Sequence, residues 1–216
     1  MTILKRFPLA IWLLCAVIVV SNSSCADSSR SVKQVAPSTP PTPTRGAPTV
    51  EIISKALDVP YVPTPPGVVA KMLELAELKP TDTLYDLGSG DGRIVITAAQ
   101  KFGVQGVGFD LNPQRIRESN ENARRAGVVE HVKFVEQDLF EVDLRDASVV
   151  TLYLLPDVNA KLLGKFQSEL KPGTRVVSHN YPIGTWEPNR VVELDIDKVK
   201  HYVYFWVVAG KQKKSK

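Results

Sequence analysis

The chain has 216 residues, of which 44% are hydrophobic and 23% charged, a composition that suits one globular domain with a buried core. The formal charge of +4 comes from the two ends, because without Lys5, Arg6 and the four lysines after residue 210 the chain holds 21 basic and 23 acidic residues. A nucleic-acid partner is therefore not expected, since it requires basic residues gathered on the folded domain. Both cysteines lie within the first 25 residues, which excludes a disulfide or a thiolate metal site in the folded part.

The first 26 residues have the order of a signal peptide or membrane anchor. Lys5 and Arg6 precede fourteen uncharged residues, 7–20, and small polar residues follow. Because a membrane span needs about 20 apolar residues, cleavage after Ala26 is preferred to a retained anchor. Lipidation of Cys25, as in a bacterial lipoprotein, is the third alternative. The sequence thus predicts an exported or membrane-associated protein.

Three further segments follow the N-terminal one. Residues 27–47 are rich in Pro, Ser and Thr and are expected to form an extended linker. Residues 48–210 form the predicted domain. Residues 211–216 are a basic tail that we expect to be solvated, with contact to a membrane surface as the lesser alternative. The oligomeric state is left open.

The domain alternates short β-rich runs with helical runs, which predicts an α/β fold with a doubly wound, mostly parallel, seven-stranded sheet. An apolar face over residues 68–78 indicates a first helix. The expected strands are 83–87, 105–111, 132–136, 148–155, 174–179, 190–196 and 201–209, and the expected helices between them are 91–102, 113–126 and 157–170. The last two strands have no helix between them and predict a C-terminal antiparallel hairpin.

A glycine-rich loop follows the first predicted strand, at the end of the strand where open α/β sheets bind ligands. It reads Asp86-Leu87-Gly88-Ser89-Gly90-Asp91-Gly92-Arg93. A dinucleotide fold requires GxGxxG, and Arg93 stands where the third glycine belongs. Two carboxylates would also repel a pyrophosphate. They suit a nucleoside that carries an amino acid, because its ammonium group pairs with a carboxylate.

Acidic residues also end the next two predicted strands. Asp110 lies twenty residues after Gly90 and is suited to accept the hydroxyl groups of a ribose. Asp138, followed by Leu139, suits the amino edge and the ring face of adenine. Each of these acids alone could be a solvated residue or a helix cap, but their occurrence at three consecutive strand ends favours a shared binding role. The sequence therefore predicts a nucleoside site along this edge of the sheet.

From Tyr61 to Ala209 the chain resembles the class I S-adenosylmethionine-dependent methyltransferases. It is most similar to the small lysine methyltransferases that include the mitochondrial enzymes acting on the ATP synthase c subunit and the adenine nucleotide translocase. Four stretches carry the resemblance: residues 60–65 (PYVPTP), 85–95, 138–140 (DLF) and 171–178 (KPGTRVVS).

The resemblance implies S-adenosylmethionine as the cofactor. Its methionine part would be held by Asp86, Gly88, Ser89 and Gly90, its ribose by Asp110 with Leu111, and its adenine by Asp138 and Leu139. Tyr61 and Thr64 would close over it.

The acceptor is expected to be a lysine amine of a protein, with Tyr153 as the candidate catalytic residue that lines its pocket. A packing role for the Tyr153 ring is an equal alternative. Base methylation is disfavoured because the fourth strand ends in Leu-Tyr-Leu-Leu-Pro and lacks the Asn/Asp-Pro-Pro pattern of enzymes acting on bases. No acid cluster is placed to hold a magnesium ion. A small-molecule methyltransferase and a non-catalytic cofactor-binding protein are the alternative functions.

The three histidines share no spacing that would indicate a common site. His131, His179 and His201 are therefore each expected to be core or surface residues. His179, at the end of the fifth strand, is the one placed to face an acceptor.

Overall fold

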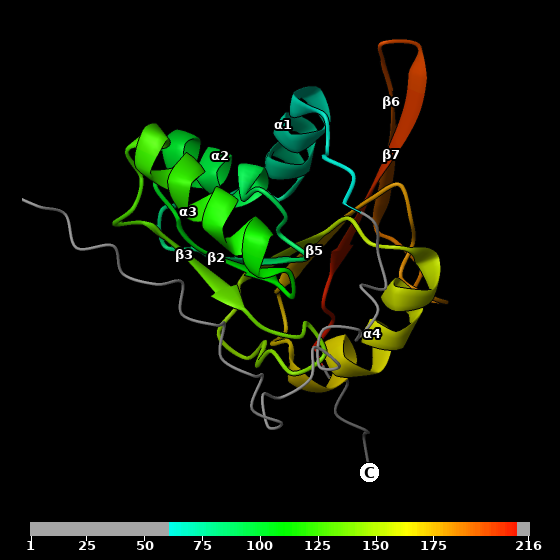
Figure 1. Ribbon diagram of the computed structural model, residues 1–216. Helices are drawn as coiled ribbons and strands as arrows, with labels where there is room; N and C mark the ends of the chain where they lie inside the picture. The colour runs from blue at the N-terminus through cyan, green and yellow to red at the C-terminus, as the bar shows by residue number, and fades with distance from the viewer. Residues whose placement is uncertain (1–60, 211–216) are drawn as a thin grey trace, which may run out of the picture. The chain divides into compact units, whose positions relative to one another are not determined.

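The computed structural model describes residues 61–210, which form one seven-stranded sheet flanked by four helices (Figure 1). The elements in chain order are α1 (Pro66–Leu75), β1 (Thr83–Leu87), α2 (Arg93–Phe102), β2 (Gln105–Asp110), α3 (Pro113–Ala126), β3 (Val132–Glu136), β4 (Val149–Leu152), α4 (Pro156–Glu169), β5 (Arg175–His179), β6 (Arg190–Ile196) and β7 (Val199–Val207). The predicted α/β fold is confirmed.

The strands lie in the order β3-β2-β1-β4-β5-β7-β6. The first five in this order are parallel, whereas β7 pairs antiparallel with both β5 and β6. The chain builds outward from β1 to β3 and then returns to place β4 on the other side of β1. The carboxyl ends of β1 and β4 therefore meet at a topological switch point, where open sheets of this kind bind ligands.

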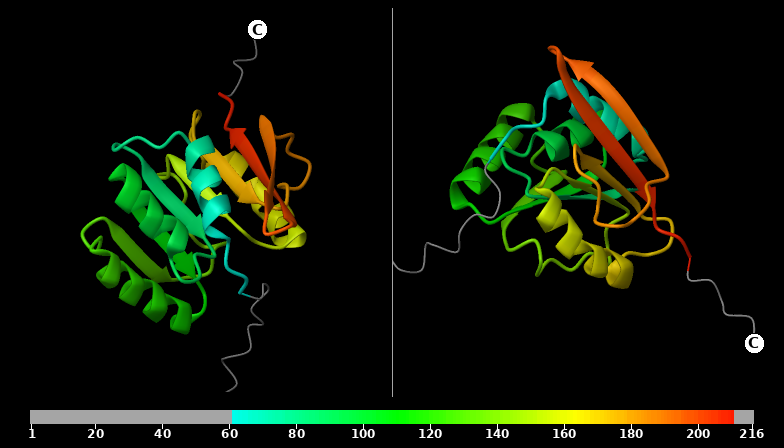
Figure 2. Two further views of the ribbon diagram at one scale, coloured as in Figure 1. Left: turned by 90° about the horizontal axis from the view of Figure 1, so that it is seen from above. Right: turned by 90° about the vertical axis from the view of Figure 1, so that its right-hand side faces the viewer.

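Helices cover both faces of the sheet, as expected for a doubly wound fold. Figures 1 and 2 show α1, α2 and α3 along one face and α4 on the other, with the hairpin β6–β7 at the end of the sheet opposite β3. Two hydrophobic clusters follow this division. One contains Val68, Met72 and Leu73 of α1, and the other contains Leu162 and Phe166 of α4. The central strand β4 lies between the two and is buried at every residue.

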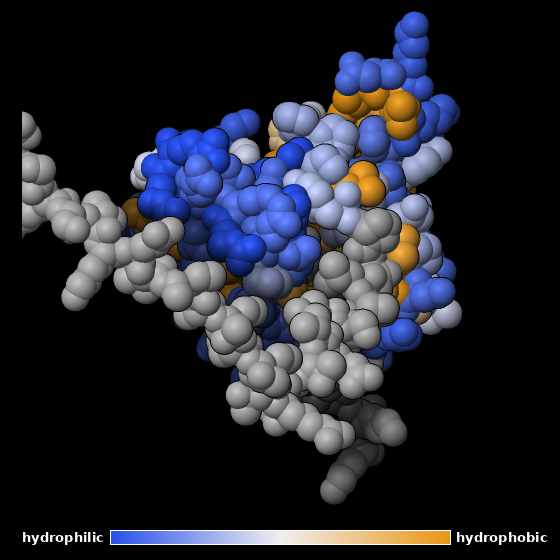
Figure 3. All heavy atoms as spheres, viewed as in Figure 1, coloured by the Kyte–Doolittle hydropathy of each residue, from blue (hydrophilic) through white to orange (hydrophobic). Residues whose placement is uncertain are grey.

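Helix α3 has the predicted bounds because both of its ends are specified locally. The side chain of Asn112 accepts a hydrogen bond from the backbone N–H of Gln114, and Pro113 is the first helical residue. Gly127 ends the helix in a left-handed conformation with φ of 71°. The helix is polar, and Figure 3 shows the hydrophilic surface over this part of the molecule.

Several elements are shorter than the sequence predicted, and three of them show the physical reason. Helix α2 begins at Arg93 rather than Asp91, because the Asp91 side chain accepts from the Arg93 N–H and Gly92 is left-handed. Helix α1 ends at Leu75, before Glu77, whose φ is 48°. Strand β4 ends at Leu152, level with the end of its neighbour β1, and leaves residues 153–155 outside the ladder.

The predictions for residues 1–26, 27–47 and 211–216 lie outside the described residues. Within residues 61–210, no helix is long and apolar enough to span a membrane.

Candidate active site

A pocket opens at the carboxyl edge of the parallel strands, where β1 to β4 end. It encloses about 1110 Å³ of empty space, its open mouth included. Every residue that the sequence analysis assigned to the site lines it: Tyr61, Thr64, Asp86, Gly88, Ser89, Gly90, Asp110, Leu111, Asp138, Leu139 and Tyr153. These residues come from five separate segments, so the topology brings them together.

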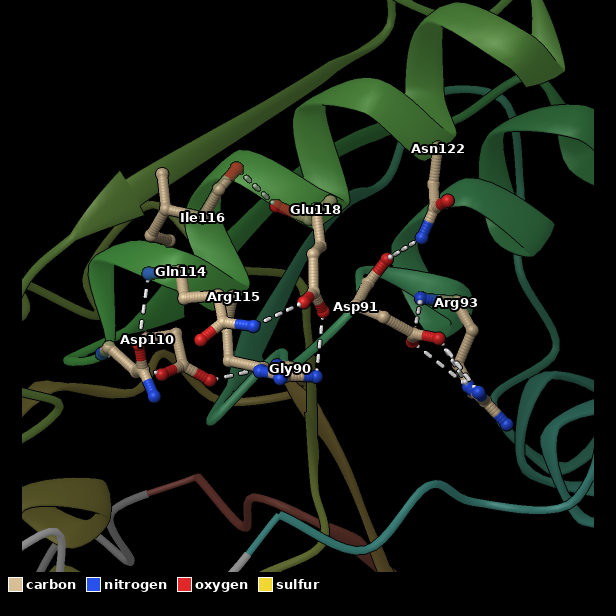
Figure 4. A network of polar contacts seen from close by, with 11 residues as sticks. Gly90, Asp91, Arg93, Asp110, Gln114, Arg115, Ile116, Glu118 and Asn122 are labelled. Carbon is tan, nitrogen blue, oxygen red and sulfur yellow. Dashed lines mark hydrogen bonds and ion pairs between the residues drawn. The ribbon is translucent and has the colours of Figure 1, made fainter.

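The carboxylates of Asp110 and Asp138 are held by backbone N–H groups. The two Asp110 oxygens accept from Gly90 N–H and Asn112 N–H, both at 2.9 Å, and Figure 4 shows the Asp110–Gly90 contact, which joins the end of β2 to the glycine-rich loop. An Asp138 oxygen accepts from Phe140 N–H at 3.0 Å. The main chain thus orients both carboxylates. Each Asp110 oxygen has two lone pairs, so it can accept from a ligand in addition to its backbone donor.

Asp86 differs from the other acids because it is buried, with 2% of its surface exposed. Burial raises its pKa to about 7, and the nearby Asp110 and Asp91 add to the increase. A hydrogen bond of 2.7 Å from the Thr151 hydroxyl opposes the increase without cancelling it. Asp86 is therefore an acid that can take up or release a proton near neutral pH, and a cation placed beside it would favour its charged form.

Residues 61–64, which we call the strap, line the pocket mouth and are tied to the glycine-rich loop by Arg93. The Arg93 guanidinium donates to the Thr64 carbonyl at 2.9 Å and pairs with both oxygens of Asp91 (Figure 4 shows the Arg93–Asp91 pair). Burial disfavours the charged form of Asp91, but its bonds to Arg93 outweigh this and lower its pKa. The pair is therefore charged on both sides and fixes the strap to the start of α2.

Tyr61 is fixed at the other end of the strap by α3 and by the loop. The Arg115 guanidinium lies 4.3 Å from the centre of the Tyr61 ring and also pairs with Glu118. Gly90 is left-handed, with φ of 53°, and a Cβ added there would lie 2.5 Å from the Tyr61 ring. A glycine is required at this position because the aromatic ring lies directly against the loop backbone.

At the β4 end of the pocket, Tyr153 is held on two sides. Its ring packs on His179, with ring centres 3.9 Å apart, and its hydroxyl lies 3.5 Å from the Asn180 amide nitrogen, which donates to it. The predicted pocket-lining position of Tyr153 and its packing role are thus both present. His179 itself is fully buried and lies behind Tyr153 rather than in the pocket wall.

Sequence reasoning did not find every residue that shapes the site. It used Arg93 only as an argument against a dinucleotide and gave Arg115 no role. It also treated His179 and His201 as unrelated, yet His179 Nε2 and His201 Nδ1 lie 3.0 Å apart. No local pattern indicates these contacts, because each joins side chains from separate elements.

The residues present fit S-adenosylmethionine, a nucleoside that carries an amino acid and a sulfonium charge. Asp86, Asp110 and Asp138 offer acceptors at three consecutive strand ends, while the cations of Arg93 and Arg115 are paired with Asp91 and Glu118. The Ser89 hydroxyl, in the same lining, is buried and has no hydrogen-bond partner within residues 61–210. An acid-lined pocket with an unsatisfied hydroxyl suits a cationic, polar ligand better than a pyrophosphate.

Comparison with known proteins supports this interpretation. The family model described as the ANTKMT methyltransferase domain matches residues 86–190. A protein-lysine N-methyltransferase of Saccharolobus islandicus is 48% identical over 151 residues, which cover 69% of this chain and 94% of that protein. The mouse adenine nucleotide translocase lysine N-methyltransferase is 40% identical over 146 residues, which cover 68% of this chain and 63% of the mouse protein.

A solved structure agrees with these relatives in fold and cofactor. The Salinibacter ruber protein described as an RNA methyltransferase, in complex with S-adenosylhomocysteine, is 49% identical with a TM-score of 0.67. The match covers 71% of this chain and 98% of that one. The fold and the pocket are those of the class I S-adenosylmethionine-dependent methyltransferases. Within this class, the chain belongs to the family of the Saccharolobus islandicus protein-lysine N-methyltransferase.

Proposed function

We propose that the protein transfers a methyl group from S-adenosylmethionine to the side-chain amine of a lysine in a protein. The observation that carries the proposal is the row of acids at the ends of β3, β2 and β1, followed at the end of β4 by Tyr153. The 48% identity with an archaeal protein-lysine N-methyltransferase, over nearly all of that protein, supports the same acceptor.

The row of acids gives the donor a direction along the sheet edge. We assign the adenine to Asp138 and Leu139 at the β3 end and the ribose to Asp110, with Leu111 beside it. The methionine part is assigned to the loop of β1, with Asp86 as the partner of its ammonium group, Gly88 and Gly90 allowing close approach, and Ser89 supplying a hydroxyl. The strap residues Tyr61 and Thr64 cover the donor.

This direction places the methyl group toward β4, where the acceptor must enter. The donor supplies a methyl group activated by its positive sulfur, so the protein has to align the acceptor and exclude water. A lysine amine must also be unprotonated, and its usual pKa of about 10.4 falls in an apolar environment. Leu154 and Val158 supply that environment beside Tyr153, whose hydroxyl is the candidate group to orient the amine.

RNA is the acceptor suggested by the description of the Salinibacter ruber protein. The charge of this chain argues against it. Residues 61–210 contain 20 acidic and 17 basic residues, a net charge of −3. Because RNA binding depends on neutralising phosphates with Lys and Arg, a net negative domain favours the protein acceptor.

The acceptor class is tested by incubating the full-length protein with methyl-labelled S-adenosylmethionine and a cell extract. Protein, RNA and small-molecule fractions are then counted, and labelled protein is hydrolysed to identify the modified amino acid. We expect label in protein as methylated lysine, and much less of it when Asp110→Ala replaces the native chain at a donor concentration near the native Kd. Label confined to RNA or to small molecules would show that the proposed acceptor is wrong.

A further inference from the structure

A buried pair of histidines lies directly behind the β4 end of the pocket. His179 ends β5 and is completely buried, and His201 lies on β7 with 9% of its surface exposed. The His179 Nε2 and His201 Nδ1 atoms are 3.0 Å apart, and the other nitrogen of His179, Nδ1, lies 3.3 Å from the Thr64 hydroxyl. Both ring nitrogens of His179 are thus in use.

The His179 ring is neutral in its buried position. Burial, and then the neighbouring His201, lowers the pKa of His179 to about 4, so the ring is uncharged at neutral pH. A neutral imidazole has one donor and one acceptor nitrogen. It either accepts from Thr64 and donates to His201, or donates to Thr64 and accepts from His201. In both tautomers His179 bridges the strap and β7.

His179 also supports Tyr153, a second residue of the pocket lining, which comes from the segment after β4. The two rings pack with centres 3.9 Å apart. The next residue, Asn180, is left-handed with φ of 61°, and its amide accepts from Tyr202 N–H at 3.0 Å and donates to the Tyr153 hydroxyl at 3.5 Å. Tyr153 is therefore held at its ring face by His179 and at its hydroxyl by Asn180.

One side chain thus connects two walls of the pocket. Thr64 comes from the strap before α1 and Tyr153 from the segment after β4, and both line the pocket while His179 does not. A leucine or phenylalanine would fill the same space but could not bond to Thr64 and His201 at the same time. The polar bridge, rather than the burial of an aromatic ring, is the feature that needs an explanation.

We propose that His179 is a positioning residue for methyl transfer, which sets Tyr153 and the Thr64 hydroxyl at the spacing that the acceptor amine requires. This inference rests on the proposed function, because it takes the β4 end of the pocket as the place where the acceptor enters. His179 does not line the pocket; within residues 61–210, its one hydrogen bond to a residue assigned to the donor is to Thr64, whose strap is held independently by the bond from Arg93 to the Thr64 carbonyl. Its loss should therefore affect transfer more than donor binding.

The test compares His179→Phe with the native chain in two measurements on the full-length protein. His179→Phe keeps an aromatic ring against Tyr153 and removes both hydrogen bonds. We expect the initial rate of label transfer to extract protein, at saturating donor, to fall at least tenfold, while the Kd for S-adenosylhomocysteine stays within threefold. His179→Gln, which retains a donor and an acceptor, should recover part of the rate. His131→Gln, at an exposed histidine away from the pocket, is the matched control.

A second variant protects the test if His179→Phe does not fold. Thr64→Val removes the same hydrogen bond from the strap side with little change in volume, and we expect a similar loss of rate. The double variant should be no slower than His179→Phe alone, because both changes remove the same Thr64–His179 hydrogen bond. Folded variants with rates within twofold of native, or losses that multiply in the double variant, would overturn the proposal. Failure of the native chain itself to label lysine would instead contradict the proposed function.

Discussion

Asp86 is the residue whose chemistry depends most on its place in the fold. Its carboxyl lies near the end of strand β1, where burial raises its pKa from 3.8 to about 7. The native state therefore holds the proton of Asp86 more tightly than the unfolded state. The resulting stabilisation is fully present below about pH 3.8 and is lost as the pH rises through about 7.

Asp86→Asn should remove this pH dependence. The asparagine cannot ionise, but its carbonyl oxygen can still accept from the Thr151 hydroxyl. Between pH 5 and pH 8 we expect the native chain to lose about 2 to 3 kcal/mol of stability relative to Asp86→Asn. Urea unfolding at both pH values measures the difference, since the other titrating groups cancel between the two proteins. An equal change in both proteins would mean that Asp86 is ionised throughout this range.

At the scale of elements, the strap and the glycine-rich loop act as one unit. Tyr61 lies against Gly90, and Arg93 bonds to the Thr64 carbonyl, so the loop holds the strap at both ends. The loop in turn bonds to the end of β2 through Asp110. A change in the loop backbone should therefore displace the strap and lower the affinity for the donor.

Gly90→Ala tests this coupling. Its Cβ would fall 2.5 Å from the Tyr61 ring, and alanine is strained at φ of 53°. We expect affinity for S-adenosylhomocysteine to fall on the order of tenfold or more, which calorimetry measures directly. The control is Gly164→Ala in α4, where an added Cβ meets no atom within 4 Å. That change should leave affinity unaltered and stabilise the fold by up to about 1 kcal/mol. Equal affinities in the two variants would show that Tyr61 does not cover the donor.

The elements differ in how well local sequence specifies them. Helix α3 has its predicted bounds because Asn112 and Gly127 end it chemically. Strand β4 does not, because the apolar run continues past Leu152 while its pairing partner β1 ends at Leu87. The end of a strand depends on its pairing partner, which the hydrophobicity of its own sequence does not indicate.

The same distinction applies to the site. The acids of β1, β2 and β3 could be predicted, because parallel strands with crossover helices must bring their carboxyl ends to one edge. The contacts of Thr64 with His179, of His179 with His201 and of Arg115 with Tyr61 could not. These pairs are far apart in sequence and follow no period, so only the packed structure brings them together.

For the molecule as a whole, residues 61–210 combine a net charge of −3 with one edge of the sheet that gathers the acids into a pocket. Figure 3 shows hydrophilic residues over α2 and α3, and apolar side chains on the hairpin β6–β7, where Val191 and Val199 are exposed. The pocket lies at the carboxyl ends of the parallel strands. The proposed function depends on that pocket holding an adenosyl amino acid.

The most direct measurement is a calorimetric titration of the full-length protein with S-adenosylhomocysteine, with NAD as a control and Asp110→Ala as the site variant. We expect micromolar binding of S-adenosylhomocysteine and none of NAD. Loss of the charged hydrogen bonds of Asp110 should weaken binding about 10- to 100-fold in a variant shown to be folded by circular dichroism. A folded native protein that binds no S-adenosylhomocysteine, or an Asp110→Ala variant that binds it as tightly, would contradict the assignment of the three strand-end acids to the donor.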